Sequence, residues 1–426
     1  MQHSTSDVLA RAESLCKIWL LVGVFWALAQ VPGNGQASDI SNLGKRDKII
    51  IPFTFENNFI VVRVTLNGRY SLRFVVDTGA ENTILLDKRI SDELDVDYRR
   101  KFTITGADQE RDLIAYLATG IDLQLDDALL ARSRAILVLE EDYANLDQVV
   151  GSPIHGILGV DFWSRFVMEI NYRTREIRLK RATEFKPGPK YREVPSVFHR
   201  HRAYIQVPIA FSEPTASTRK LLLDTGAGIT MLLHTYGDTI REQDLPVPTL
   251  PGYIANGIGG NVNGNVGRAR QITLGGKTLA DVITYFQPLD TLGKNYLHGR
   301  RGIIGNKVLS RYRIAIDFVR SKVYFRPDGR AMRQRFRFDR SGLSIVAGGR
   351  RLNQFYVARV VADSPAAVAG LCIGDRIASV NGTSCTFLSL GAIIERLRGK
   401  IGRRVRMKYV RDNQYIRTEF TLQELI

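Results

Sequence analysis

The stretch Phe74-Val75-Val76-Asp77-Thr78-Gly79-Ala80 decides the fold, because the chain contains this pattern twice. It recurs as Leu221-Leu222-Leu223-Asp224-Thr225-Gly226-Ala227, and the two aspartates are 147 residues apart. In each copy an apolar run, typical of a buried strand, leads directly into Asp-Thr-Gly-Ala. A single Asp-Thr-Gly indicates little more than a polar turn after a strand, so the recurrence is the informative feature.

Two further landmarks repeat in the same order. Gly156-Ile157-Leu158-Gly159 recurs as Gly302-Ile303-Ile304-Gly305, and Glu169-Ile170-Asn171-Tyr172 recurs as Ala315-Ile316-Asp317-Phe318, both 146 residues later. A solenoid needs three or more short repeats. Two long copies instead predict two homologous lobes in one polypeptide.

Each lobe is expected to be mostly β. In the first copy, residues 49–53, 59–66 and 72–76 form short apolar or alternating runs, and Asn67-Gly68 is a strong hairpin-turn signal. Proline and glycine mark breaks at Pro187-Gly188-Pro189 and Pro327-Asp328-Gly329. These breaks predict a first lobe over residues 45–186, a second over 190–328 and a basic, polar linker over 329–340.

The repeated motifs resemble those of the pepsin and retropepsin superfamily of aspartic peptidases, over residues 47–327. Ala80 and Ala227, which follow the two Asp-Thr-Gly triplets, are closer to the retropepsin pattern than to the pepsin pattern. The resemblance implies the bilobal acid-protease fold, with two homologous β lobes and an active site between them.

The same resemblance implies a catalytic dyad of Asp77 and Asp224, one from each lobe. Two close carboxyl groups share a proton, so that the ionised one activates a water and the protonated one polarises the scissile carbonyl. No metal or cofactor is implied, and no Cys/His cluster has metal-ligand spacing. Six residues are implied to cross-link or support the two catalytic loops: Thr78, Gly79, Thr225, Gly226, Gly159 and Gly305.

Substrate contacts are expected from two flaps and one acidic side chain. Gly257, Gly259 and Gly260 resemble a glycine-rich flap tip in the second lobe, and Gly106 occupies the corresponding place in the first. Glu81 matches the acidic residue with which retropepsins bind substrate backbone, whereas the second copy has Gly228 there. His155 and His298 precede the Gly-Ile-Leu-Gly and Gly-Ile-Ile-Gly elements, and we interpret both as loop histidines, because the dyad needs none.

Residues 341–426 have a different character. The ordered elements Ser364-Pro365-Ala366, Ala369-Gly370-Leu371, Gly374-Asp375-Arg376-Ile377 and Val380-Asn381-Gly382 are similar to those of PDZ domains, especially those of bacterial envelope proteases. The resemblance implies a small α+β domain, a β sandwich with two helices, that binds peptides.

A peptide groove can be placed in this domain. Gly342-Leu343-Ser344-Ile345 lies where PDZ domains hold a peptide's terminal carboxylate with backbone N–H groups. Leu390 and Ile394 lie on one face of a predicted helix that would form the other wall. A peptide C-terminus would then add to the sheet as an extra strand. The alternative is that the helical stripe is simply core.

Composition leaves the surface chemistry open. The chain has 60 basic and 43 acidic residues, a net charge of +17. A well-solvated basic surface is the favoured interpretation, and attraction to anionic partners is the alternative. No nucleic-acid-binding module is evident. Cys16, Cys372 and Cys385 are the only cysteines, which excludes a disulfide framework apart from a Cys372–Cys385 bridge.

Residues 1–37 resemble a targeting segment. Basic Arg11 and Lys17 precede an apolar run from Ile18 to Leu28, and Ala27-Leu28-Ala29 is a small-residue cleavage signal. We expect export to the periplasm or the exterior through a cleaved signal. The alternative is an uncleaved membrane anchor formed by residues 18–28.

The sequence therefore predicts a monomeric, exported aspartic endopeptidase that cleaves proteins or peptides and carries a C-terminal PDZ domain. Two other functions remain open: a non-catalytic, chaperone-like peptide-binding protein of the envelope, and a scaffold organised by the PDZ domain. Intact Asp77 and Asp224 favour the first function.

Overall fold

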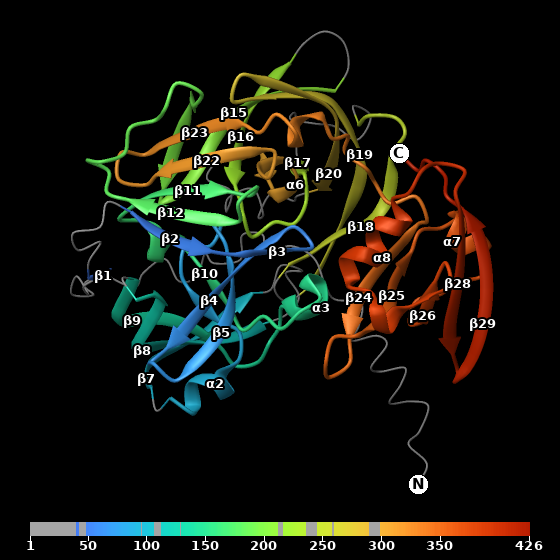
Figure 1. Cartoon of the computed structure of the whole chain (residues 1–426), viewed down its shortest axis with the longest axis horizontal. Coiled ribbons are helices and arrows are strands. Elements are labelled where there is room, and N and C mark those ends of the chain that lie inside the picture. The colour runs from blue at the N-terminus through green and yellow to red at the C-terminus, as the bar shows by residue number, and fades with distance from the viewer. Residues whose placement is uncertain are drawn as a thin grey trace. The chain divides into compact units, whose positions relative to one another are not determined.

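The computed structural model describes residues 40–41, 48–94, 96–105, 112–127, 129–211, 216–235, 245–257, 260–288 and 299–426. The predicted targeting segment, Gly106, Gly259 and His298 lie outside the described residues. The described chain forms two compact units. One comprises residues 40–144 and Ile154–Phe336, and the other comprises Asn145–Pro153 and Arg337–Ile426 (Figure 1).

The first unit contains a sheet built around the strand that ends at Asp77. Its strand order is β1-β9-β6-β10-β5-β4-β8-β7, with β3 paired to β4. The strands are β1 (Ile40–Ser41), β3 (Thr54–Glu56), β4 (Phe59–Leu66), β5 (Tyr70–Val76), β6 (Ile84–Leu85), β7 (Asp97–Thr105), β8 (Asp112–Asp126), β9 (Leu129–Leu139) and β10 (Gly156–Leu158). Asn67 and Gly68 join β4 to β5 with positive φ angles of 45° and 67°, as the hairpin-turn signal predicts.

A second sheet is built in the same way around the strand that ends at Asp224. Its order is β14-β15-β16-β21-β17-β20-β19-β18. The strands are β14 (Ser196–His199), β15 (Arg202–Ala210), β16 (Ser217–Leu223), β17 (Met231–Thr235), β18 (Leu250–Gly257), β19 (Gly260–Leu274), β20 (Lys277–Pro288) and β21 (Gly302–Ile304). In each sheet the Gly-Ile-Leu or Gly-Ile-Ile strand pairs parallel to the strand that precedes the aspartate, β10 with β5 and β21 with β16.

A third sheet joins the two lobes. Its order is β13-β23-β22-β11-β12-β2. The strands are β2 (Ile49–Pro52), β11 (Val167–Asn171), β12 (Glu176–Lys180), β13 (Arg192–Val194), β22 (Tyr312–Asp317) and β23 (Lys322–Pro327). Because β11 of the first lobe pairs antiparallel with β22 of the second, one chain supplies both halves of this unit.

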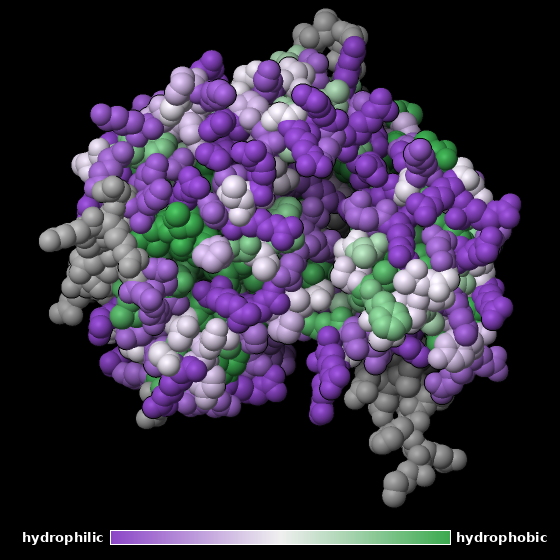
Figure 2. Space-filling model, viewed as in Figure 1, coloured by the Kyte–Doolittle hydropathy of each residue, from purple (hydrophilic) through white to green (hydrophobic). Residues whose placement is uncertain are grey.

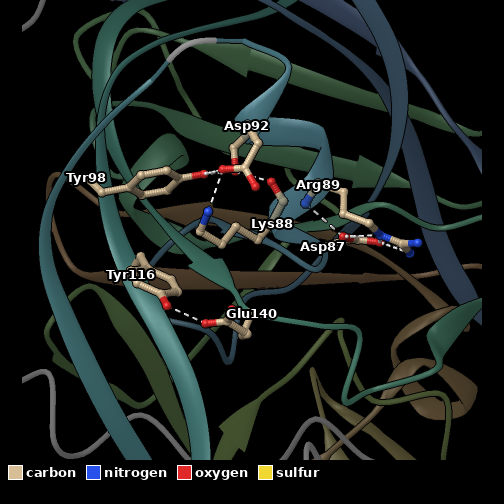
Figure 3. A network of polar contacts seen from close by, with 8 residues as sticks. Asp87, Lys88, Arg89, Asp92, Tyr98, Tyr116 and Glu140 are labelled. Atoms are coloured by element: carbon tan, nitrogen blue, oxygen red, sulfur yellow. Dashed lines mark hydrogen bonds and ion pairs between the residues drawn. The ribbon is translucent and has the colours of Figure 1, made fainter.

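Short helices complete the unit: α2 (Lys88–Asp92), α4 (Val160–Trp163), α6 (Asn306–Leu309) and the 3-10 turn η2 (Ala331–Arg333). Asp87 caps α2 by accepting a hydrogen bond from the N–H of Arg89 at 2.9 Å. Tyr98 and Lys88 both donate to the Asp92 carboxylate, and Tyr116 pairs with Glu140 nearby (Figure 3). The hydrogen bond from Tyr98 to Asp92 and the stacking of Lys88 over the Tyr116 ring hold α2, which follows the first Asp-Thr-Gly loop, against β7 and β8.

The second unit contains a sheet of order β24-β25-β26-β28-β29, with β27 paired to β26. Its elements are α3 (Leu146–Val150), β24 (Leu343–Gly348), β25 (Gln354–Val360), α7 (Pro365–Val368), β26 (Arg376–Val380), β27 (Thr383–Ser384), the 3-10 turn η3 (Cys385–Phe387), α8 (Leu390–Leu397), β28 (Arg404–Arg411) and β29 (Gln414–Thr421). Ser364 caps α7, with Pro365 in its first turn, as the sequence predicts. The mostly β class and the small C-terminal α+β domain are therefore confirmed.

Some details differ from expectation. Residues 337–340, which the sequence assigns to a linker, group with the second unit. Cys372 and Cys385 are both free thiols, so the Cys372–Cys385 bridge left open by the sequence is not formed. Within the described residues, no helix is long and apolar enough to cross a membrane. Hydrophilic residues cover most of the face seen in Figure 2, with smaller apolar patches between them.

Candidate active site

Thr78 and Thr225 tie the two aspartate loops together. The N–H of Thr78 donates to Oγ1 of Thr225, and the N–H of Thr225 donates to Oγ1 of Thr78, both at 3.0 Å. Each hydroxyl also donates at 2.7 Å to a carbonyl of the opposite lobe, Thr78 to Leu223 and Thr225 to Val76. All four bonds are buried, so both threonines have satisfied hydroxyls and hold the lobes in register.

Asp77 and Asp224 lie at the ends of β5 and β16. The N–H of Asp77 donates to the carbonyl of Leu158 and that of Asp224 to the carbonyl of Ile304, each at 3.1 Å. The side chains are 1% and 0% exposed, respectively. Hydrogen bonds to the parallel strands β10 and β21 thus fix the backbone position of each aspartate.

The two carboxyl groups face the opposite loops across the lobe junction. A Cβ at Gly79 would lie 2.8 Å from Cγ of Asp224, and a Cβ at Gly226 would overlap Cγ of Asp77. Each glycine therefore has a steric reason to be glycine. The structure therefore places each carboxyl group against the loop that carries the other aspartate.

The two carboxyl groups accept different numbers of backbone hydrogen bonds. Oδ1 of Asp77 accepts from the N–H groups of Gly79 at 2.7 Å and Ala80 at 3.1 Å. Oδ1 of Asp224 accepts from the N–H of Gly226 at 2.8 Å. The additional donor stabilises the ionised form of Asp77 relative to that of Asp224.

Burial raises the pKa of both aspartates. Burial raises the pKa of Asp77 to about 6, against the backbone hydrogen bonds and the positive charge of Arg202, which lower it. Burial and then the negative charge of Asp77 raise the pKa of Asp224 well above its usual value. Both carboxyl groups therefore favour the protonated form more than exposed aspartates do, and they titrate as a pair.

Gly159 and Gly305 lie beside the two aspartate loops. Each is the N-cap of a short helix, Gly159 of α4 and Gly305 of α6. A Cβ at Gly159 would lie 2.5 Å from the carbonyl oxygen of Asn82, and one at Gly305 would lie 2.6 Å from that of Ala227. The two aspartate loops therefore pack directly on these glycines.

Asn306 is a junction residue that sequence reasoning missed. Its Nδ2 donates to the carbonyls of Thr225 at 2.6 Å and Asn58 at 2.8 Å, and its Oδ1 accepts from the hydroxyl of Tyr172 at 2.7 Å. The side chain is fully buried. The corresponding residue of the first lobe is Val160. A polar amide side chain directly after Gly302-Ile303-Ile304-Gly305, where the first copy has valine, was the one sequence feature that could have indicated this role.

Glu81 has ionic partners that the sequence did not indicate. Its carboxylate pairs with the buried Arg202 of β15 and, at 3.3 Å, with Arg200. The predicted contact of Glu81 with substrate backbone stays a prediction. Gly228, its counterpart, instead lies against a ring, since a Cβ there would be 2.8 Å from Cε2 of Phe59. The two sides of the site thus differ in polarity.

Both predicted flaps have paired strands. Gly257 and Gly260 are partners at the end of the β18–β19 hairpin. In the first lobe β7 and β8 pair up to Thr105 and Asp112, next to the undescribed Gly106.

His155 accepts a hydrogen bond from the N–H of Arg73 at 3.2 Å, and burial lowers its pKa, which fits a loop histidine.

The predicted groove residues of the second unit lie in β24 and α8, except Gly342, which directly precedes β24. Gly342 has a φ of 85°, and Leu343 and Ile345 are buried on either side of half-exposed Ser344. Leu390 is buried and Ile394 packs at the edge of the core. Leu390 is therefore a core residue, and the groove role of Ile394 stays a prediction. No group of three or more potential metal-ligating side chains is found in the described ranges.

Comparison with known families agrees with these two units. An aspartyl protease family model matches residues 62–162, which include Asp77, and a PDZ domain model matches residues 356–411. The chain therefore carries an aspartyl protease domain and a PDZ domain.

An aspartic proteinase is among the solved structures that are similar to this chain. The crystal structure of aspartic proteinase from Irpex lacteus is 14% identical, with a TM-score of 0.38, over 67% of this chain and 99% of that chain. The comparison with curated proteins finds no match.

Proposed function

We propose that this protein is a single-chain aspartic endopeptidase in which Asp77 and Asp224 form the catalytic dyad. The observation that carries the proposal is the reciprocal bonding of Thr78 and Thr225, which holds both aspartates at one junction. Shared burial of two carboxyl groups favours one proton between them, the state that this chemistry needs.

The unequal donors suggest the role of each aspartate. Asp77, with two backbone donors and the charge of Arg202, is the ionised base that removes a proton from water. Asp224 keeps its proton and donates a hydrogen bond to the scissile carbonyl oxygen. Water oxygen bonds to the carbonyl carbon as Asp77 takes the water proton and Asp224 gives its proton to the carbonyl oxygen. The tetrahedral intermediate then breaks its C–N bond as Asp77 gives that proton to the amine nitrogen, and Asp224 regains a proton from the hydroxyl that becomes the new carbonyl.

One chain is proposed to suffice for activity. The β11–β22 pairing makes a continuous sheet from both lobes, so the second aspartate needs no second molecule. The C-terminal domain is proposed to bind peptides along β24 and α8 and so recruit substrates or regulate their access. Export, through residues 1–37, is part of the same proposal and rests on the sequence alone.

A statine-type transition-state mimic tests the enzymatic function. We expect it to bind one per chain, measured by calorimetry, and to block cleavage of a quenched-fluorescent peptide library, while metal chelators leave cleavage unchanged. Inhibition by chelators without inhibition by the mimic would contradict the proposal. A non-catalytic peptide-binding protein, the alternative, would bind library peptides and release no cleaved product.

A further inference from the structure

The carboxylate of Asp339 fills the position at the Gly342–Ile345 loop where the sequence predicts the terminal carboxylate of a bound peptide. Its Oδ1 accepts from the N–H groups of Ser341 at 2.9 Å, Gly342 at 2.6 Å and Leu343 at 3.2 Å. The hydroxyl of Ser341 donates to the same oxygen at 2.8 Å. The first two N–H groups of the Gly342–Ile345 loop are therefore already paired with a carboxylate.

The contact is built into the domain. Asp339 is partly buried, and burial raises its pKa against the hydrogen bonds of the loop and the charge of Arg398, which lower it. The neighbouring Arg340 anchors the segment, since its N–H donates to the carbonyl of Leu397 and its Nη1 donates to that of Gly399. These bonds tie Asp339 to the end of α8, which is the far wall of the predicted groove.

The loop also has little freedom to form a second arrangement. Gly342 has a φ of 85°, and a Cβ there would overlap the side chain of Ser364. Its carbonyl accepts from the N–H of Val361, and the carbonyl of Ser341 accepts from the N–H of Ala366 at 2.9 Å. The N–H groups therefore stay directed at the position that Asp339 fills.

A free C-terminus would meet this position at a disadvantage. Its carboxylate would compete for N–H groups already in use and would approach a second carboxylate in a partly desolvated site, where like charges repel strongly. An internal segment of polypeptide carries no such charge. It can pair with β24, the edge strand of its sheet, through main-chain hydrogen bonds when it displaces α3, which packs against β24 and ends beside Leu390.

We propose that this domain selects internal, extended segments of polypeptide rather than free C-termini, and that Asp339 determines this specificity. The inference rests on the proposed peptide-binding function of the domain and narrows it. This specificity differs from the sequence-based expectation of C-terminal ligands. That expectation considered the Gly342–Ile345 loop alone, without the Asp339 carboxylate to which its N–H groups donate.

The test uses the full chain and peptide libraries displayed in two ways. Random heptapeptides are displayed once with a free C-terminus and once followed by further residues, and are selected on Asp77→Asn protein to prevent cleavage. One enriched peptide of each kind is then synthesised as the C-terminal acid and as the C-terminal amide. Fluorescence anisotropy gives the Kd of each form for this protein and for versions that also carry Asp339→Asn or Asp339→Ala.

When Asp339 is intact, we expect the selection to enrich internal sequences. We also expect the C-terminal amide of each peptide to bind at least as tightly as the C-terminal acid. Asp339→Ala removes the resident carboxylate, and the acid should then bind about tenfold more tightly than before, equivalent to about 1.4 kcal/mol. Asp339→Asn keeps the hydrogen-bond acceptor without the charge and serves as the matched control for folding. Its acid affinity should lie between the other two.

Each other outcome has a definite meaning. Tighter binding of acid than of amide while Asp339 is intact would overturn the specificity inference and leave peptide binding in place. An acid affinity that neither substitution changes would also overturn it. Failure of every peptide to bind any of the three proteins, with unchanged thermal unfolding, would refute peptide binding itself.

Discussion

Each of Thr78 and Thr225 accepts the other's backbone N–H on its hydroxyl oxygen at 3.0 Å and donates that hydroxyl to a carbonyl beside the other's aspartate. The arrangement is reciprocal, so neither aspartate loop can shift without breaking bonds to the other. The relative position of the Asp77 and Asp224 loops is thus set by buried hydrogen bonds between lobes.

Thr78→Val is expected to destabilise the protein by about 2–4 kcal/mol, because the hydroxyl removed leaves a buried N–H and a buried carbonyl without partners. Thr225→Val should have a similar effect by symmetry. Urea unfolding measures the change, and kcat/KM should fall with it. Thr78→Ser keeps the hydroxyl and is the control. A valine variant as stable and active as this control would contradict the role of the threonine pair.

Gly226→Ala tests the close approach of the loop to Asp77. The added Cβ would overlap the carboxyl carbon of Asp77, so we expect kcat to fall by about 100-fold or more as the carboxyl group is displaced. Gly188→Ala is the matched control, because a Cβ at Gly188 has no neighbour within 4 Å. Equal activity of the two variants would show that Asp77 does not lie against this loop.

The pH–rate profile should be bell-shaped with its acidic limb near pH 6. Burial raises the pKa of Asp77 to about 6, so below that pH the base becomes protonated and activity is lost. The alkaline limb should follow loss of the shared proton, held by Asp224, whose pKa burial raises well above its usual range. The optimum is therefore expected to be less acidic than pepsin's, in line with Ala80 and Ala227, which offer no hydroxyl to the dyad. A kcat/KM that continues to rise below pH 4 would oppose this assignment.

Arg202→Gln should move the acidic limb to higher pH. Burial is the main cause of the raised pKa of Asp77, and the positive charge of Arg202 works against it. Removing that charge makes ionisation of Asp77 harder. Arg200→Gln is the control, since Arg200 also pairs with Glu81 but has a more exposed side chain. An identical limb in both variants would separate Arg202 from the dyad.

The repeated motif made the site predictable, because Asp-Thr-Gly-Ala after an apolar strand requires similar local geometry wherever it occurs. Asn67-Gly68 and Ser364-Pro365 likewise specify their turn and helix start locally. These features depend on neighbours in sequence, which is why their positions agree with the structure.

Other residues of the site depend on contacts that no local pattern reveals. Asn306 bonds to Asn58, 248 residues away, and Arg202 pairs with Glu81 across the lobe junction. Asp339 lies three residues before the start of the predicted Gly342–Ile345 loop, yet only the folded backbone shows the N–H groups of Ser341, Gly342 and Leu343 converging on it. Tertiary packing therefore decides how the predicted elements function.

The most direct measurement of the central claim is the cleavage rate of a peptide substrate by the protein and by its Asp77→Asn and Asp224→Asn variants, with thermal unfolding as the control for folding. We predict that each variant retains its fold and loses activity by a factor on the order of 10³ or more, because the two carboxyl groups act as a unit. Cleavage by either variant at close to the original rate would contradict the assignment of Asp77 and Asp224 as the catalytic dyad.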